Sequence, residues 1–268
     1  MCNLSFTEMR APRPDEPVAG TRFRTRWLGE ASSTNTVAAA AAAAGEPEGL
    51  AVAAEHQTAG RGRLGRSWVA PAGSALLTSV LLRPPPAATQ LAVTAVGCAA
   101  AAACARLSGV EPGLKWPNDL IVGGRKLGGI LAEAATGAGN VTAVVVGLGL
   151  NTARPPHVPE DLAPVATWLD QHTQAMPDRP ALLSAILIEL EPRYQSLTTS
   201  GPQALLAEYR RRCVTIGQRV RVEQADRTLE GTAVAVDDGA ALIIETTAGV
   251  TVRVEVGDVV HVRPGTWA

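Results

Sequence analysis

Two spacings of apolar residues divide this chain. Up to about residue 213, apolar runs alternate with longer alanine- and leucine-rich stretches, as in strands interleaved with helices. The predicted strands cover residues 23–28, 50–55, 75–82 and 141–150, and the predicted helices cover 38–44, 91–107, 179–197 and 202–212. Beyond Cys213 apolar and polar residues alternate with a period of two, which predicts five short strands at 219–222, 229–236, 241–245, 250–256 and 259–262.

These patterns predict an α+β fold in two domains. Residues 1–21 are rich in proline and charge without periodicity, so we expect a disordered tail there. Residues 22–213 form the larger domain around a mixed sheet, and residues 214–268 form a small β-barrel that is too small to be the main body. Within the larger domain, Gly123 and Gly124 suit the two-residue turn of a β-hairpin.

A polar group stands at the start of the first predicted helix. Ser33, Thr34 and Asn35 precede the alanine run, and Gly45 follows it. Such residues cap helices by accepting backbone N–H hydrogen bonds, whereas alanine propagates a helix and glycine ends it. The same side chains also suit a polar ligand, so capping and ligand binding stay equal alternatives here.

The composition limits the classes of function. With 46% apolar but only 3% aromatic residues, the core is expected to consist of Ala, Val, Leu and Ile. A formal net charge of −1 argues against bulk nucleic-acid binding. The four cysteines show neither close pairing nor metal-ligand spacing, which is typical of reduced thiols in a cytoplasmic protein, and Cys98 and Cys104 are expected in the core. Neither a signal peptide nor a membrane span is predicted.

The segment from Gly60 to Trp68 is the strongest indication of chemistry. Its first seven residues alternate three glycines with three arginines, broken only by Leu64. Glycine lets the backbone bend closely around a ligand, and arginine offers planar, permanently charged donors that match phosphate and carboxylate oxygens. We therefore interpret the segment as a loop that closes over a polyanion.

Three other interpretations of this arginine loop are weaker. It nearly matches a nucleotide-binding P-loop, with Arg66 in place of the lysine, but Pro71 and Gly73 follow where that loop requires a helix. A nucleic-acid loop lacks a basic face elsewhere to support it. A solvated turn would explain the loop alone, but not the further motifs below.

Lysine is nearly absent from the chain. Of 24 basic residues only Lys115 and Lys126 are lysines, and both fall between residues 114 and 131. Arginine does not replace lysine where a compact point charge must fit a small site. Chance placement is the alternative, but we interpret both as functional, Lys126 above all.

Four segments together resemble the biotin protein ligases. They are Ser33 to Asn35, Glu55 to Trp68, Lys115 to Leu120 with Lys126 to Leu131, and Gly147 to Asn151. The resemblance runs from about residue 23 to the C-terminus. It implies a mixed-sheet catalytic domain of the biotin/lipoate ligase type, followed by an SH3-like barrel.

The resemblance also implies a reaction. Biotin and ATP would form biotinyl-5′-AMP with release of pyrophosphate, and biotin would pass to a lysine of a biotin carboxyl carrier domain, as in a biotin–[acetyl-CoA carboxylase] ligase. The implied biotin-binding residues are Ser33, Thr34, Asn35, Gln57, Gly60, Arg61, Gly62, Arg63, Lys126, Gly129, Ile130, Leu131, Gly147 and Gly149. The implied ATP- and adenylate-binding residues are Arg61, Arg63, Arg66, Trp68, Lys126 and Asn151. The implied catalytic residues are Lys126, Arg63 and Asp119.

These assignments fit the chemistry of adenylation. A carboxylate must approach the α-phosphate, and the arginine loop with Lys126 supplies the positive field that holds two anions together. The polar side chains at 33–35 and 57 match the ureido head of biotin. Asp119 is a candidate for positioning the acceptor lysine or for aiding its deprotonation, and holding the turn around it is an equal alternative. Mg²⁺ is expected with ATP, held by phosphates and water.

The alternatives and partners follow from the same residues. A lipoate ligase would share the fold, but lipoate lacks a ureido group to pair with the polar set Ser33, Thr34, Asn35 and Gln57. A non-catalytic biotin sensor would not need Lys126 and the arginine loop. About twenty residues precede the first strand, so we expect a monofunctional ligase without DNA binding or membrane association; a weak homodimer is left open.

Overall fold

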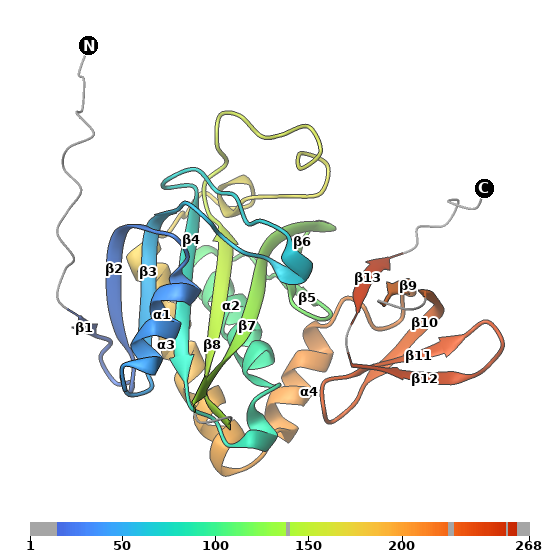
Figure 1. Ribbon diagram of the computed structural model, residues 1–268. Helices are drawn as coiled ribbons and strands as arrows, with labels where there is room; N and C mark the ends of the chain where they lie inside the picture. The colour runs from blue at the N-terminus through green and yellow to red at the C-terminus, as the bar shows by residue number, and fades with distance from the viewer. Residues whose placement is uncertain (1–14, 138–139, 225–227, 256, 262–268) are drawn as a thin grey trace.

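The computed structural model describes residues 15–137, 140–224, 228–255 and 257–261, which form two sheets with four α-helices (Figure 1). The large sheet has the strand order β1-β2-β3-β4-β8-β7-β6-β5 and the small one β12-β11-β10-β9-β13. The large sheet consists of β1 Glu16–Pro17, β2 Arg24–Ala31, β3 Leu50–Gln57, β4 Ala75–Leu82, β5 Gly113–Lys115, β6 Asp119–Val122, β7 Arg125–Gly137 and β8 Asn140–Asn151. The small sheet consists of β9 Arg219–Glu223, β10 Thr228–Val236, β11 Leu242–Thr246, β12 Thr251–Val254 and β13 Asp258–His261.

Both faces of the large sheet are covered. Its helices are α1 Thr34–Ala43, α2 Ala92–Ser108, α3 Arg179–Thr199 and α4 Gln203–Arg212. Leu50 and Val52 of β3 pack in the cluster that contains α1, whereas Ala51 and Ala53 pack in the cluster that contains α2 and α3. Burial on both faces explains why this strand is a continuous apolar run rather than an alternating one. Strands β2 and β3 are parallel and the other neighbours are antiparallel, which makes the sheet mixed.

Helix α2 is the centre of the main core. Cys98 and Cys104 are fully buried in it, as predicted, and burial raises the pKa of each thiol to about 12. Gly97 lets the helix approach the sheet, because a Cβ there would lie 3.2 Å from Ile130 Cδ1. Cys98, Cys104 and Cys213 are free thiols, and Cys2 lies outside the described residues.

The predicted strands and helices of both domains are confirmed to within a few residues. Gly123 and Gly124 have φ of 57° and 74°, the left-handed conformation of a two-residue hairpin turn between β6 and β7. The short strands β1 and β5 were not predicted. Residues 1–14 of the expected tail lie outside the described residues.

The expectation of disorder is wrong for residues 15–21. Glu16–Pro17 pair with β2, and Asp15 accepts hydrogen bonds from Arg26 Nε and Nη2, each at 2.7 Å. Val18 belongs to the main core. The absence of periodicity in this short segment concealed a strand that its neighbour holds in place.

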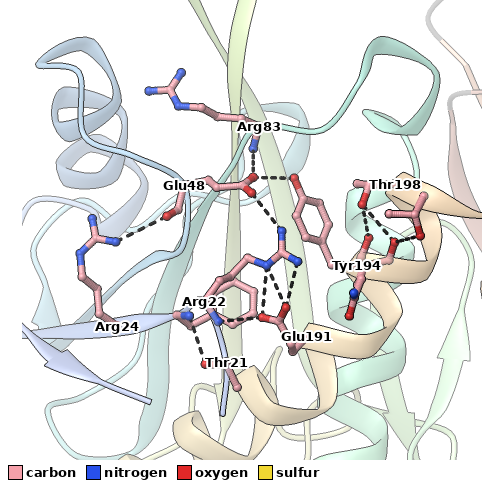
Figure 2. A network of polar contacts seen from close by, with 11 residues as sticks. Thr21, Arg22, Arg24, Glu48, Arg83, Glu191, Tyr194 and Thr198 are labelled. Carbon is pink, nitrogen blue, oxygen red and sulfur yellow. Dashed lines mark hydrogen bonds and ion pairs between the residues drawn. The ribbon is translucent and has the colours of Figure 1, made fainter. Parts of the chain in front are cut away.

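A polar network fastens one end of the sheet to α3 (Figure 2). Glu48, just before β3, accepts hydrogen bonds from Tyr194 Oη at 2.8 Å and from Arg83 N at 3.0 Å. Arg22 bridges Glu48 and Glu191, with Nη1 3.0 Å from Glu48 Oε1 and Nε 3.0 Å from Glu191 Oε1. Burial would raise the pKa of Glu191, but the hydrogen bonds from Arg22 outweigh it and lower that pKa. The network holds the end of β3 opposite to Gln57, so it supports the site from a distance.

The small sheet stands beside the β5–β6 edge of the large one (Figure 1). Trp116, in the turn between β5 and β6, donates from Nε1 to Ala240 O at 2.8 Å and from its backbone N to Thr215 Oγ1 at 3.0 Å. Gly113 of β5 lies against Val214, where a Cβ would collide with that side chain. The turn that carries Asn118 and Asp119 is therefore held from both sides.

Candidate active site

A cavity of ≈ 1550 Å³ opens where α1 begins and where β3, β7 and β8 meet the arginine loop. The predicted site residues that line it are Ser33, Thr34, Asn35, Gln57, Arg61, Gly62, Arg63, Arg66, Trp68, Asp119, Lys126, Gly129, Ile130, Leu131, Gly147, Gly149 and Asn151. Gly60 is the one predicted residue that does not line it. Its Cα backs onto the Trp68 carbonyl, where a Cβ would collide, so glycine is needed at this approach.

The start of α1 holds a buried hydrogen-bond network. Thr34 N donates to Gln57 Oε1 at 2.7 Å, and Thr34 Oγ1 lies 3.0 Å from the same oxygen. Ser79 Oγ of β4 lies 2.7 Å from Thr34 Oγ1 and 2.5 Å from Asn35 Oδ1. Ser33 is buried at the N-cap position, but its side chain makes no capping hydrogen bond, so the capping interpretation is wrong for Ser33.

Glycines on β7 and β8 make room for site side chains. A Cβ on Gly147 would collide with Asn35, and one on Gly149 would lie 2.5 Å from Trp68 Cε2. A Cβ on Gly129 would lie 3.1 Å from Lys126 Nζ and 3.2 Å from Trp68 Cζ3. The resemblance assigns these glycines to the biotin site, and in the structure the space above them is occupied by the side chains of Asn35, Trp68 and Lys126.

The arginine loop is tied to three separate parts of the chain. Arg61 Nη2 donates to Glu133 Oε2 at 2.7 Å. Arg63 donates from Nη1 to Asn118 Oδ1 at 3.2 Å and from Nη2 to Gly257 O at 3.3 Å. The loop contains only a three-residue 3₁₀ turn, Arg63–Gly65, which agrees with rejecting the P-loop because no helix follows.

Lys126 and Asp119 form an ion pair inside the cavity, with Nζ 2.6 Å from Oδ1. A β-bulge between β6 and β7 breaks the alternation of side chains, so Lys126 and Gly129 share the cavity face while Leu127 packs in the core. The Lys126 backbone is held by the 152–167 segment, because its N donates to Val165 O at 2.7 Å. Its ammonium also lies 5.7 Å from the Trp68 ring centroid, a cation–π distance.

Ser79, Glu133 and Asn118, which hydrogen-bond to predicted site residues, were not themselves predicted. Ser79 and Glu133 are hidden in strands, and their only sequence signal is a polar residue within an apolar run. Asn118 accepts from Arg63 and donates from Nδ2 to Ile130 O at 2.7 Å, which fixes the turn before β6. Asn151, which was predicted, donates to Thr167 O at 3.0 Å and holds the far end of the 152–167 segment. Lys115 also lines the cavity.

Residues 15–137, 140–224, 228–255 and 257–261 contain neither a metal-binding cluster nor a membrane-spanning helix. Among those residues, no group of three or more His, Cys, Asp or Glu side chains is arranged to hold a metal ion. Within the same part of the chain, no helix is long and apolar enough to cross a membrane.

Comparison with known proteins places this geometry in a family. Residues 29–151 match the model of the biotin/lipoate A/B protein ligase family, and residues 215–262 match the biotin protein ligase C-terminal domain. The chain is 42% identical over 244 residues to the biotin–[acetyl-CoA-carboxylase] ligase of Mycobacterium tuberculosis, covering 88% of each protein. The chain belongs to the biotin protein ligase family.

Other members of the biotin protein ligase family agree with this placement. The bifunctional ligase/repressor BirA of Bacillus subtilis is 33% identical over 226 residues, with 82% of this chain and 68% of that protein covered. The structure of the biotin protein ligase from Aquifex aeolicus in complex with biotin and ATP superposes with a TM-score of 0.76 at 25% identity, covering 89% of this chain and 98% of that one. The predicted fold, a mixed-sheet domain with a small SH3-like sheet, is confirmed.

Proposed function

We propose that this protein is a biotin–[acetyl-CoA-carboxylase] ligase. It activates biotin with ATP to biotinyl-5′-AMP, releases pyrophosphate, and transfers biotin to a lysine of a biotin carboxyl carrier domain. The observation that carries the proposal is a single cavity that joins a buried polar network at Thr34 and Gln57 to a lysine and three arginines. A relative named for this activity, 42% identical over 88% of the chain, supports it.

The polar network is suited to the ureido head of biotin. Ser33, Thr34 and Asn35 are each at most 4% exposed, so a ligand that reaches them leaves water behind. Buried donors and acceptors reject a ligand that cannot pair with them, which favours biotin over lipoate. Gly60, Gly62, Ile130 and Leu131 complete the proposed biotin site.

Lys126 is the proposed catalytic cation. The reaction brings the biotin carboxylate to the α-phosphate of ATP, and an ammonium between them stabilises the charge that both contribute. Arg61, Arg63 and Arg66 add positive charge on the loop side. Asp119 is paired with Lys126. Its proposed role, once the adenylate has formed, is to position the acceptor lysine or to aid its deprotonation.

The nucleotide is assigned to the side of the cavity formed by Trp68 and Asn151. The Trp68 ring, lying over Gly149, offers an aromatic face to adenine. Mg²⁺ enters with ATP and is held by phosphate and water oxygens. With a formal net charge of −1 the chain has no basic bias, so we propose no nucleic-acid partner. The free buried thiols fit a cytoplasmic protein.

Biotin-dependent exchange of labelled pyrophosphate into ATP tests the proposal, with lipoate run in parallel. We expect exchange with biotin and none with lipoate. Exchange with lipoate alone would make the protein a lipoate ligase. Tight biotin binding with no exchange would make it a sensor.

A further inference from the structure

One carboxylate at the rim of the cavity has no part in the roles described so far. Glu133 of β7 accepts two hydrogen bonds on the same oxygen, Oε2: from Asn35 Nδ2 at 2.6 Å and from Arg61 Nη2 at 2.7 Å. Its side chain is 38% exposed, whereas Asn35 is 4% exposed. Glu133 therefore connects the first arginine of the loop to the buried start of α1.

This carboxylate fixes which way the Asn35 amide points. A carboxylate paired with arginine only accepts hydrogen bonds, so Asn35 turns its Nδ2 donor toward Glu133. Its second Nδ2 proton faces Leu131 O at the longer distance of 3.3 Å. Asn35 Oδ1 is then left facing Ser79 Oγ at 2.5 Å, and the single proton of the Ser79 hydroxyl must be donated to it.

The direction of the Ser79 hydrogen bond in turn determines which groups of Thr34 and Gln57 donate and which accept. With its own proton committed to Asn35, Ser79 Oγ can take part in its 2.7 Å contact with Thr34 Oγ1 only as an acceptor. The one Thr34 hydroxyl proton goes either to Ser79 Oγ or to Gln57 Oε1, 3.0 Å away, and is engaged in both cases, while Thr34 N donates to Gln57 Oε1 at 2.7 Å. Thr34 thus offers the cavity an acceptor, and Gln57, its oxygen engaged, offers the Nε2 donor. A ligand head with an N–H beside a carbonyl oxygen, such as a ureido group, matches that order.

We propose that Glu133 is a positioning residue for biotin. Its charge sets the donor and acceptor order of the Asn35–Ser79–Thr34–Gln57 chain, and its bond to Arg61 ties the loop to that chain. Glu133 acts through these residues rather than by touching the substrate. The inference rests on the proposed function, since it names what selects the ureido head.

Two single variants, one at Glu133 and one at Asn35, disturb the donor and acceptor order of the hydrogen-bond chain. Glu133→Gln keeps the shape but can donate as well as accept, so the orientation of Asn35 is no longer dictated. We expect it to raise the KM for biotin in pyrophosphate exchange about tenfold, while the KM for ATP changes by less than about twofold. Asn35→Asp sets two carboxylates against each other and is expected to raise the KM for biotin at least as much.

The double variant Asn35→Asp with Glu133→Gln tests whether biotin binding depends on the donor and acceptor order of the chain or only on a contact between residues 35 and 133. The amide introduced at 133 donates to the carboxylate introduced at 35, whose other oxygen accepts from Ser79. Both the order and the net charge return. We expect the KM for biotin to fall to within about threefold of the native value. A double variant whose KM equals or exceeds the product of the two single effects overturns the proposal.

Binding and folding measurements keep the outcomes distinct. Glu245→Gln makes the same charge change on an exposed position of β11 and is expected to leave both KM values unchanged. Calorimetric titration with biotin alone reads affinity without catalysis, and thermal unfolding checks that each variant is folded. If the native protein neither binds biotin nor catalyses exchange, the proposed function itself fails. If the native protein does both and Glu133→Gln binds biotin equally well, only the role of Glu133 fails.

Discussion

At the scale of single residues, the 2.6 Å ion pair between Lys126 and Asp119 limits how the reaction can proceed. In the proposed reaction, biotin and ATP must share or replace the carboxylate as a partner of the ammonium. A lysine whose backbone is fixed by Val165 and whose ammonium lies 5.7 Å from the Trp68 ring centroid can make that exchange by moving only its end. In the proposed reaction, that exchange would free Asp119 to meet the acceptor lysine.

Replacing Lys126 tests this view directly. Lys126→Ala removes the charge between the two anions, so we expect pyrophosphate exchange to fall about 10²-fold or more. Lys115→Ala, the matched change at the other lysine, is expected to cost less than about tenfold, because no charge between the reacting groups is lost. Equal losses at the two lysines would contradict the assignment.

Arg63 is predicted to keep the adenylate in place. It is bonded to Asn118 and to Gly257, so Arg63→Gly removes two anchors of the loop at once and adds backbone freedom. We expect biotinyl-5′-AMP to escape, seen as labelling of a bystander protein such as serum albumin at least about tenfold above the native level.

Arg63→Lys, which keeps the charge but not the two-armed contact, is expected to give an intermediate level of labelling. Loss of ligand binding without any escape would show that the loop does not act as a gate.

At the scale of elements, α2 depends on small apolar side chains that no water reaches. Cys98 and Cys104 take the place of alanines in a helix that contacts β7 and β8 directly. Because burial raises the pKa of both thiols to about 12, they stay protonated where an ordinary thiol reacts. The rate at which these two thiols react with an alkylating reagent therefore shows whether the main core is folded and inaccessible to solvent.

Alkylation followed by peptide mapping measures that protection. At pH 8 we expect Cys98 and Cys104 of the native protein to react at least about 10²-fold more slowly than after unfolding in urea. The same shift predicts alkaline instability. The stability from keeping these thiols neutral is complete below the unfolded pKa of 9.0 and is lost as the pH rises toward about 12. Equal alkylation rates in native and unfolded protein would refute the buried placement.

The elements were predictable from sequence because their signals are local. Apolar period, alanine runs and the glycine pair at 123–124 each act over a few residues, and the structure follows them. The site segments were recognisable for a related reason, since each is a short run whose residue types suit one kind of ligand. Cross-strand register, in contrast, has no local sequence signal. The bulge that turns Lys126 into the cavity leaves no local pattern.

The contacts made by buried or half-buried polar side chains on strands also escaped prediction. Ser79 and Glu133 matter because of residues more than forty positions away, Asn35 above all. Only the order of strands β4, β8 and β7 in the sheet brings them together. The same holds for β1, whose two residues pair only because β2 lies beside them.

At the scale of the whole molecule, the small sheet contacts two parts of the candidate site, the turn between β5 and β6 and the arginine loop. The turn between β5 and β6 is bonded to it through Trp116, and the arginine loop is bonded to it through Gly257. Val214, Gln218 and Val259 also line the cavity. The C-terminal part of the chain therefore forms part of the cavity wall.

Trp116→Phe tests whether the two sheets work as a unit. The change removes the donor to Ala240 O and leaves that carbonyl without it, so we expect the free energy of unfolding in urea to fall by about 1–3 kcal/mol. Because the small sheet also anchors Arg63, adenylate escape should rise together with the loss of stability. Lower stability with no added escape would make the bond purely structural.

The placement of both lysines in one cavity has a practical consequence. Besides its amino terminus, this chain offers an amine-selective acylating reagent only two targets, and a bound nucleotide or acyl adenylate would shield both. Mass spectrometry of acetylated protein therefore reads occupancy directly, without a label on the ligand. It also means that coupling this protein to an amine-reactive support would use either its amino terminus or a lysine of this cavity.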